Sequence, residues 1–525
     1  MSYSKGINAT AATLTKLRTG DSNCPFSGMC VTCLDGCPGL CEIGKSSIRG
    51  KETLYPQPFG KITAAAEKDY PVDYSHFNIA GTAVGAHGIA ADPDVATFPN
   101  VNIESAVGAY GDLPLRLPIV IAGMGSTNVA ADNWEHLAAG AAISGVGIVI
   151  GENVVGMDPK SEIKNGKVVK APNLEKRVKD FQNWYNGKGF VAVQANVEDT
   201  RLGVQEFALE KLGVEVVELK WGQGAKDIGG EVKLNTLERA KQLYSRGYIV
   251  LPNPEDPEVE KAFKAGAFTE FERHSRIGMV TEDSFHARVK QLREAGAKYV
   301  FLKTGAYRAA DLARAVKFAS DAKIDLLTVD GAGGGTGMSP WRMMNEWGIP
   351  TLYIQALLTR YLDKLAAKGA FVPKVAIAGG FTLEDHMFKA LAMSAPYVKA
   401  VGMARSPLTA AMVGKTVGEA VKQGKVPNEY KKYGETLEQV FIYAHELKNK
   451  LGKDFDKLPV GAVGVYTYFE RLAQGLRQLM CGARKFALEY ITRDDIFALT
   501  KEAAEITGIK YVMEHDAEEA EKILG

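Results

Sequence analysis

Five of the chain's six cysteines fall within eighteen positions near the N-terminus, the densest group of potentially reactive side chains in the sequence. They are Cys24, Cys30, Cys33, Cys37 and Cys41, whereas Cys481 stands alone. Thiolates at this spacing can enclose one inorganic cluster, because a 4Fe–4S cube takes its sulfur ligands from a compact loop. We therefore predict an iron–sulfur site formed by four of these five cysteines. A structural zinc site is the main alternative, and disulfides or free thiols are a third.

A glycine-rich stretch runs from Asp330 to Pro340, directly after a predicted strand. Glycine allows close approach of the backbone to a ligand, and successive N–H groups can form an anion-binding nest. The cofactor-binding residues predicted here are Asp330, Gly331, Gly334 and Gly335. A flexible surface loop is the alternative.

Two further turns predict a phosphate site. They contain Gly379-Gly380 and Gly402-Met403, and Arg405 follows the second. In a barrel of parallel strands the last two loops form the phosphate site, and backbone amides with a guanidinium can satisfy a dianion. For Arg405 a surface ion pair is the alternative.

Charged side chains end three of the predicted strands. Lys220, Lys303 and Glu152 each follow an apolar run, and Lys226 lies six residues beyond Lys220. A cation at such a position can stabilise the anionic edge of a reduced flavin, which is one way that proteins tune this cofactor. The alternative for each of these groups is a solvated charge at the rim of the fold.

Eight short apolar runs supply the elements that would position these residues. They predict strands at 118–122, 147–151, 190–194, 215–219, 299–303, 326–330, 375–379 and 399–403. Continuous apolar runs are typical of a parallel sheet buried on both faces. Helical stretches follow most of them, most clearly 308–319 and 383–393. Eight such units predict an α/β fold, a (β/α)8 TIM barrel. An open doubly wound sheet is the alternative, although no G-x-G-x-x-G follows the first run.

We divide the chain into four parts: an iron–sulfur segment at 1–50, a connecting region packed on the barrel at 51–112, the barrel at 113–414 and a helical C-terminal extension at 415–525. Residues 221–298 are predicted to hold an inserted loop region over the active site. In the extension, 434–451 and 468–490 have the apolar spacing of helices.

The composition excludes several classes of protein. A net charge of +1 gives no basic surface for nucleic acid or membranes. There is no run of 18 or more apolar residues, so no transmembrane helix is predicted. The first residues lack the apolar region of a signal peptide, so we expect a cytoplasmic protein.

Four segments, in order, resemble the FMN-binding synthase domain of glutamate synthase. They are 118–124 (PIVIAGM) with 151–153 (GEN); 218–220 (ELK) with 223–226 (QGAK) and 229–230 (GG); 301–303 (FLK); and 334–337 (GGTG) with 339–340 (SP). The resemblance covers residues 110–410, and the QGAK and GGTG segments are its most specific part.

The resemblance implies a bound FMN over the strand ends, beside Gly123 and Met124. It implies flavin contacts from Glu152, Gln223 and Lys303, and an oxo-acid contact from Lys220. In the family's reaction a reduced flavin delivers hydride to 2-iminoglutarate, which gives glutamate, and electrons arrive through an iron–sulfur cluster. By this analogy the expected catalytic residues are Lys220, Glu152 and Lys226.

Departures from the family concern the cluster and the substrate. Segment 402–414 lacks the family's three cluster cysteines, so the N-terminal cysteines are expected to replace them. Asp227 stands where the family has proline, and Ala332 and Gly333 stand where it has His-Asp, which leaves the identity of the oxo acid open.

The implied partners follow from the same comparison. No Rossmann domain is recognised, so ferredoxin or another electron-transfer protein is the expected donor. No glutaminase domain is recognised either, so ammonia from glutamine would need a separate subunit. We also expect a homo-oligomer. The alternative functions are an FMN-binding subunit of a multi-chain transferase, such as the methylamine–glutamate methyltransferase type, and a barrel that binds without reacting.

Overall fold

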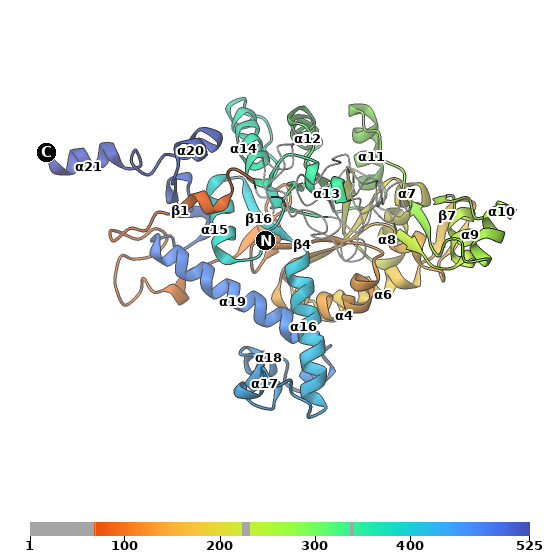
Figure 1. Ribbon diagram of the computed structural model, residues 1–525. Helices are drawn as coiled ribbons and strands as arrows, with labels where there is room; N and C mark the ends of the chain where they lie inside the picture. The colour runs from red at the N-terminus through yellow and green to blue at the C-terminus, as the bar shows by residue number, and fades with distance from the viewer. Residues whose placement is uncertain (1–67, 69, 223–231, 336–340) are drawn as a thin grey trace, which may run out of the picture.

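The computed structural model describes residue 68 and residues 70–222, 232–335 and 341–525. Its centre is a closed barrel of eight parallel strands surrounded by helices (Figure 1). The strands, in their order around the barrel, are β13 (Tyr299–Thr304), β14 (Leu326–Asp330), β15 (Val375–Ala378), β16 (Val398–Met403), β4 (Ile119–Met124), β5 (Gly147–Ile150), β8 (Phe190–Ala195) and β9 (Val216–Lys220). Each overlaps one predicted strand, so the predicted TIM barrel is confirmed.

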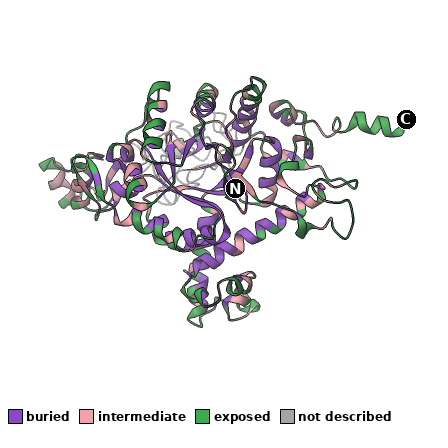
Figure 2. Cartoon of the chain, turned by 180° about the vertical axis from the view of Figure 1, so that it is seen from behind, coloured by how far each residue is buried: buried purple, intermediate pink, exposed green. Residues whose placement is uncertain are grey.

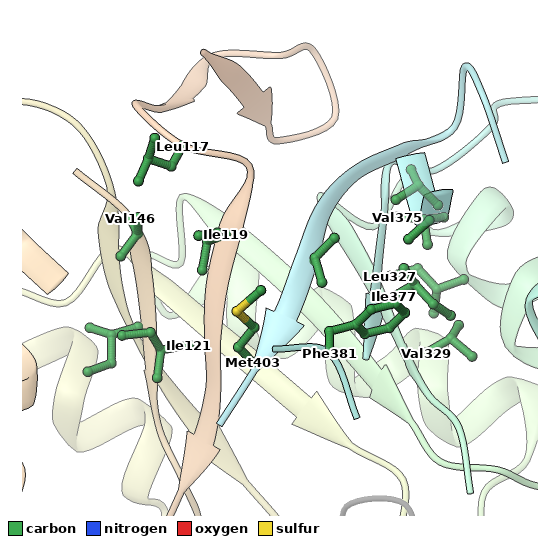
Figure 3. Packing of buried hydrophobic residues seen from close by; sticks show 14 of the residues in the cluster. Leu117, Ile119, Ile121, Val146, Leu327, Val329, Val375, Ile377, Phe381 and Met403 are labelled. Atoms are coloured by element: carbon green, nitrogen blue, oxygen red, sulfur yellow. The ribbon is translucent and has the colours of Figure 1, made fainter. Parts of the chain in front are cut away.

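Side chains alternate between the two faces of the barrel wall, and both faces are buried. On β4, Ile119 and Ile121 belong to the core between strands and helices, whereas Val120 belongs to the core inside the barrel. Figure 3 shows part of the outer layer, and Figure 2 shows the strands buried and the outer faces of the helices exposed. A strand buried on both faces is apolar at nearly every position. This is why continuous apolar runs identified the strands.

Helices follow the strands and form the outer layer. They are α4 (Asn128–Ser144), α6 (Pro172–Gln182), α8 (Val204–Leu212), α11 (Glu282–Glu294), α12 (Ala309–Asp321), α14 (Thr351–Ala367), α15 (Glu384–Met393) and α16 (Arg405–Lys422). The predicted helices at 308–319 and 383–393 correspond to α12 and α15. Position 414, where the sequence divides barrel from extension, lies inside α16.

An antiparallel hairpin, β2 (Ser105–Val107) with β3 (Leu113–Leu115), packs at the N-terminal end of the barrel. Its buried Val107 and Leu115 share one apolar cluster with the interior residues Phe190 and Phe301. The two phenylalanine rings pack edge to face with centroids 5.2 Å apart, a favourable geometry for aromatic pairs. This end of the barrel is therefore packed with apolar side chains.

The long connection after β9 is a small folded unit, so the prediction of a loop region was wrong. Its described part contains a sheet of β10 (Val232–Leu234), β12 (Phe271–His274) and β11 (Ile249–Leu251), with α9 (Leu237–Ser245) and α10 (Pro257–Lys264). These elements bury a core of their own, which a loop could not do. In Figure 1 the unit lies at one side of the barrel.

The C-terminal extension differs in detail from the predicted helices. The stretch 434–451 is broken into α17 (Leu437–Val440) and α18 (Ala444–Leu451), because Phe441 leaves helical geometry and buries its ring. The second helix is α19 (Gly461–Gly482), which begins seven residues before the predicted start. Gly461 and Gly464 are poor helix formers, and they obscured that start.

The rest of the extension packs against an element from the N-terminal part of the described chain. Its β17 (Ile496–Ala498) pairs with β1 (Phe77–Ile79), and α20 (Lys501–Thr507) and α21 (Ala517–Leu524) follow. In the described ranges, no helix combines the length and apolar character that crossing a membrane requires.

Candidate functional site

A cavity of about 980 Å³ lies at the C-terminal ends of the barrel strands. Most of the predicted site residues that the structure describes line it: Gly123, Met124, Glu152, Lys220, Lys303, Asp330, Gly334, Gly335, Gly379, Gly380, Gly402, Met403 and Arg405. Gly331 does not line it. A Cβ on Gly331 would lie 2.3 Å from the Cα of Thr351, so this glycine allows backbone packing behind the cavity wall.

Side chains of a strand point to the same face at every second residue, and this alternation explains why charged side chains lie together at the cavity. Along β13, Tyr299 and Phe301 belong to the apolar core of the barrel, and Lys303, two residues further, lines the cavity. On the neighbouring strand Lys220 is in register with Lys303. Because side chains of a strand alternate between faces, the last inward position of each strand lies at the cavity floor.

Two buried ion pairs occupy that floor. Lys220 Nζ lies 2.8 Å from Glu152 Oε2, and Lys303 Nζ lies 3.1 Å from Asp330 Oδ2. The lysine side chains are only 4% and 5% exposed. Burial alone would raise the pKa of Glu152, but Lys220 and Lys303 hold it below its usual value. Burial alone would lower the pKa of Lys303, but Asp330, Glu218 and Glu152 hold it above its usual value. Glu152 and Lys303 are therefore both charged at neutral pH.

A neutral amide and a further carboxyl lie beneath these pairs. Gln194 Nε2 donates to Glu218 Oε1, and both side chains are buried. Burial raises the pKa of Glu218. Gln194 Oε1 has no hydrogen-bond partner among the described residues. A Cβ on Gly123 would lie 2.9 Å from that oxygen, so only glycine fits there without displacing the amide. The sequence analysis missed Gln194, although it ends an apolar run as Lys220 does.

Glycines form the wall at the last two strand ends. Gly379 and Gly380 have φ of 128° and 108°, a region that side chains disfavour. A Cβ on Gly402 would lie 2.7 Å from Ala378 Cβ. Directly afterwards α16 begins at Arg405, so N–H groups of its first turn and the helix dipole are directed toward this wall. This backbone has the form expected of a phosphate site, and the phosphate assignment stays a prediction.

The inserted unit contributes one cation to the cavity. Arg273, on β12, is 1% exposed and lines the cavity. Its Nη1 donates to Ser275 Oγ, its guanidinium stacks 5.0 Å from the ring centroid of Tyr248, and its Nε has no partner among the described residues. Burial lowers the pKa of Arg273, yet an arginine stays charged. The sequence analysis missed it, because nothing in a polar strand of an insertion marks a cavity residue.

Two buried side chains, Arg177 and Asp199, hold the backbone around Glu152 in place by hydrogen bonds on its two sides. Arg177 Nη1 donates to Gly125 O at 2.9 Å and to Met124 O at 3.3 Å, and Met124 O also accepts from Gly151 N. On the other side, Asp199 Oδ2 accepts from Asn153 N at 2.8 Å. Asn153 has φ of 64°, so its backbone is held in the left-handed region.

The C-terminal extension also reaches the cavity. Four residues of α19 line it, namely Gly464, Thr467, Tyr468 and Arg471. The sequence predicted a helical extension here and assigned none of these residues to the site. Their spacing of three, one and three positions would have indicated a single helix face.

Several predicted residues lie outside the described residues. They are Gln223 and Lys226, which were assigned to the flavin and to catalysis, and the five cysteines Cys24, Cys30, Cys33, Cys37 and Cys41. The substituted position Asp227 and residues 336–340 of the glycine-rich stretch lie outside them as well. These predictions therefore remain predictions.

Comparison with known proteins supports the resemblance. Residues 273–415 match the family model described as a conserved region in glutamate synthase, which confirms the resemblance for this part of the chain. No curated protein matches the chain.

Similar solved structures include enzymes of another kind. A mandelate oxidase variant with 2-hydroxy-phenylacetamide has 14% identity and a TM-score of 0.41, covering 79% of this chain and 84% of that one. The monotopic membrane protein (S)-mandelate dehydrogenase has 12% identity and a TM-score of 0.42, covering 81% and 89%. An IMP dehydrogenase/GMP reductase-like protein from Corynebacterium glutamicum has 11% identity and a TM-score of 0.43, covering 83% and 97%.

Proposed function

We propose that this chain is an FMN- and iron–sulfur-dependent oxidoreductase of the glutamate synthase type, which reduces an imino acid formed from an oxo acid and ammonia. The family match over 273–415 supports an FMN-dependent oxidoreductase. The observation that carries the proposal is the pair of buried ion pairs, Lys220–Glu152 and Lys303–Asp330, at the floor of a cavity with glycine walls.

The donor set of the cavity fits FMN. A Cβ would lie 2.3 Å from Thr351 Oγ1 at Gly379 and 2.7 Å from Ala378 Cβ at Gly402, so bare backbone lines the cavity at these positions. Arg405 adds a cation for the phosphate. Lys303 would lie against the ring system, where a cation stabilises the anion of the reduced form. FMN, once bound and reduced by two electrons, would supply a hydride to an electrophilic carbon.

The remaining charges suit an acidic substrate. Lys220 and Arg273 both line the cavity and are buried, and a buried cation binds a carboxylate more strongly than an exposed one does. Glu152 Oε2 holds the Lys220 side chain in place at 2.8 Å. This arrangement supports a dicarboxylic oxo acid such as 2-oxoglutarate as the substrate.

The path of the chain supports electron entry from the cysteine segment. Lys68 Nζ lies 2.6 Å from Glu346 Oε2, and Glu346 ends α13 (Trp341–Glu346), which follows the glycine-rich stretch after β14. The chain therefore leaves the segment before residue 68 at the cavity end of the barrel. We propose that the N-terminal cysteines hold a 4Fe–4S cluster that passes electrons from ferredoxin to the flavin.

The experiment is a single-turnover reaction with anaerobically reduced, FMN-loaded protein. Mixing with 2-oxoglutarate and ammonium is expected to reoxidise the flavin and form one glutamate per flavin. Lys220→Met is expected to slow this step at least a hundredfold, because a charged substrate contact is lost, whereas the exposed control Lys170→Met reacts as wild type. Absence of reoxidation by any oxo acid with ammonium would overturn the proposal and favour the transferase subunit. An unchanged rate in Lys220→Met would remove that lysine from the site.

A further inference from the structure

One face of α19 forms part of the cavity wall. Gly464, Thr467, Tyr468 and Arg471 line the cavity and are separated by three, one and three positions, which places them on one side of the helix. Helix α19 belongs to the C-terminal extension, outside the eight βα units and beyond the family match that ends at 415.

Gly464 brings this face close to α16. A Cβ on Gly464 would lie 2.4 Å from the carbonyl oxygen of Ala410 and 2.7 Å from the Cα of Gly414. Both contacts are with backbone, so any side chain at 464 would push the helices apart. The close approach lets α19 reach the first turn of α16, where the glycine wall ends.

Tyr468 connects the two loops of the glycine wall. Its hydroxyl donates to the carbonyl oxygen of Thr382, in the loop after Gly379-Gly380. The same hydroxyl lies 4.0 Å from Met403 Sδ and also contacts the hydroxyl of Ser406, at the start of α16. Burial raises the pKa of Tyr468, so its hydroxyl remains a neutral donor.

Arg471 makes the second connection. Its Nη1 pairs with Glu384 at the start of α15, and a Cβ on Gly475 would lie 2.7 Å from the Cδ of Glu384. The carboxylate is thus packed against α19, and it pairs with a guanidinium that lines the cavity, as Arg405 does.

We propose that this face of α19 completes the phosphate subsite of the cofactor, with Tyr468 as a positioning residue for the two glycine loops and Arg471 as a second cation beside Arg405. A phosphate carries close to two negative charges at neutral pH, and a second guanidinium would add charge-assisted hydrogen bonds to those from Arg405 and the backbone amides. The C-terminal extension is then part of the binding site for the phosphorylated flavin. This inference rests on the proposed function.

The test compares binding of FMN and of riboflavin, which lacks the phosphate, to flavin-free full-length protein by fluorescence titration. Tyr468→Phe is expected to weaken FMN binding about three- to tenfold, the value of one hydrogen bond, and Arg471→Gln about ten- to a hundredfold. Riboflavin binding is expected to stay at the wild-type value in both variants. The matched control is Tyr466→Phe, which removes a hydroxyl on the same helix that donates to Glu446 away from the cavity.

The outcomes separate this inference from the proposed function. Wild-type FMN affinity in both Tyr468→Phe and Arg471→Gln would overturn the phosphate role of α19 and leave the flavin assignment intact. Equal losses for FMN and riboflavin would also overturn it, because they would reveal a general effect on the fold. If the wild-type protein bound neither flavin, the proposed function itself would fail.

Discussion

At the scale of single residues, the site consists of charges that burial forces into pairs. Lys220 and Glu152 are one pair, Lys303 and Asp330 another, and a lone buried charge would cost several kcal/mol, on the order of the penalty for desolvating an ion. Removing one member therefore takes away the ion pair that offsets the desolvation of its partner. A variant at this floor tests chemistry only when the partner's charge is considered as well.

Asp199 gives a prediction about pH. Burial, with the nearby charge of Glu152, raises its pKa to about 7, although the N–H of Asn153 acts in the opposite direction. In the unfolded chain an aspartate titrates near pH 4. Between about pH 4 and pH 7 the folded protein holds a proton that the unfolded chain has lost, so this group's contribution to stability falls as pH rises and is lowest above pH 7.

The variant Asp199→Asn removes this titration and keeps an acceptor for the N–H of Asn153. We expect the difference in melting temperature, variant minus wild type, to be larger at pH 8 than at pH 5. Differential scanning calorimetry of both proteins at the two pH values measures this difference. A difference in melting temperature that is the same at both pH values would show that Asp199 is ionised in the folded protein throughout this range.

The sequence predicted the site residues that end apolar barrel strands. It did not predict the cavity residues that belong to the insertion and to the C-terminal extension. Lys220 and Lys303 were predicted because a charge after a buried strand is conspicuous. Arg273 and Tyr468 were not, because the first lies on a polar strand of an insertion and the second on a helix of the extension. Their place in the cavity depends on tertiary contacts, which local patterns do not encode.

At the scale of elements, the strands were predicted most accurately because burial on both faces leaves a strong signal. The weakest predictions were the insertion after β9 and the helices of the extension. In α19 the glycines lower helix propensity, yet Gly461 and Gly464 are both required where α16 and α19 touch. Packing thus overrides local preference at the residues that position the cavity wall.

Two glycines of α19 test this packing. Gly464→Ala gains helix propensity, but its Cβ would meet backbone atoms at 2.4 Å, so we expect a net loss of about 1–3 kcal/mol, typical of overpacking. Gly482→Ala on the same helix has nothing within 4 Å of its Cβ and is expected to be neutral or slightly stabilising. Urea denaturation of the two variants measures both values. Equal midpoints would contradict the close approach of α16 and α19.

At the scale of the whole molecule, three regions meet at one end of the barrel. The insertion supplies Arg273, the extension supplies Tyr468 and Arg471, and Lys68 of the connecting region pairs with Glu346 of α13. The barrel alone was predictable from its strands. That the remaining parts converge on its C-terminal end was not, because their contacts join residues hundreds of positions apart.

Replacing Cys30 and Cys33 with serine tests the proposed electron path. The double variant is expected to bind FMN as wild type does, since described residues of the barrel and the extension line the cavity, but to lose iron and the ability to be reduced by ferredoxin. Stopped-flow reduction by reduced ferredoxin measures this, and chemical reduction of the flavin by dithionite is the control. Normal reduction by ferredoxin in the double variant would rule out these cysteines as the entry point.

The most direct test of the central claim is the cofactor content of protein purified without oxygen. Flavin released by acid is identified and counted, and iron, sulfide and zinc are measured on the same sample. The proposed function predicts one FMN and about four irons per chain, the content of one 4Fe–4S cluster. Protein that contains no FMN and takes up none on reconstitution would contradict the assignment of the cavity. FMN with zinc and no iron would leave the flavin site standing and remove the cluster from the electron path.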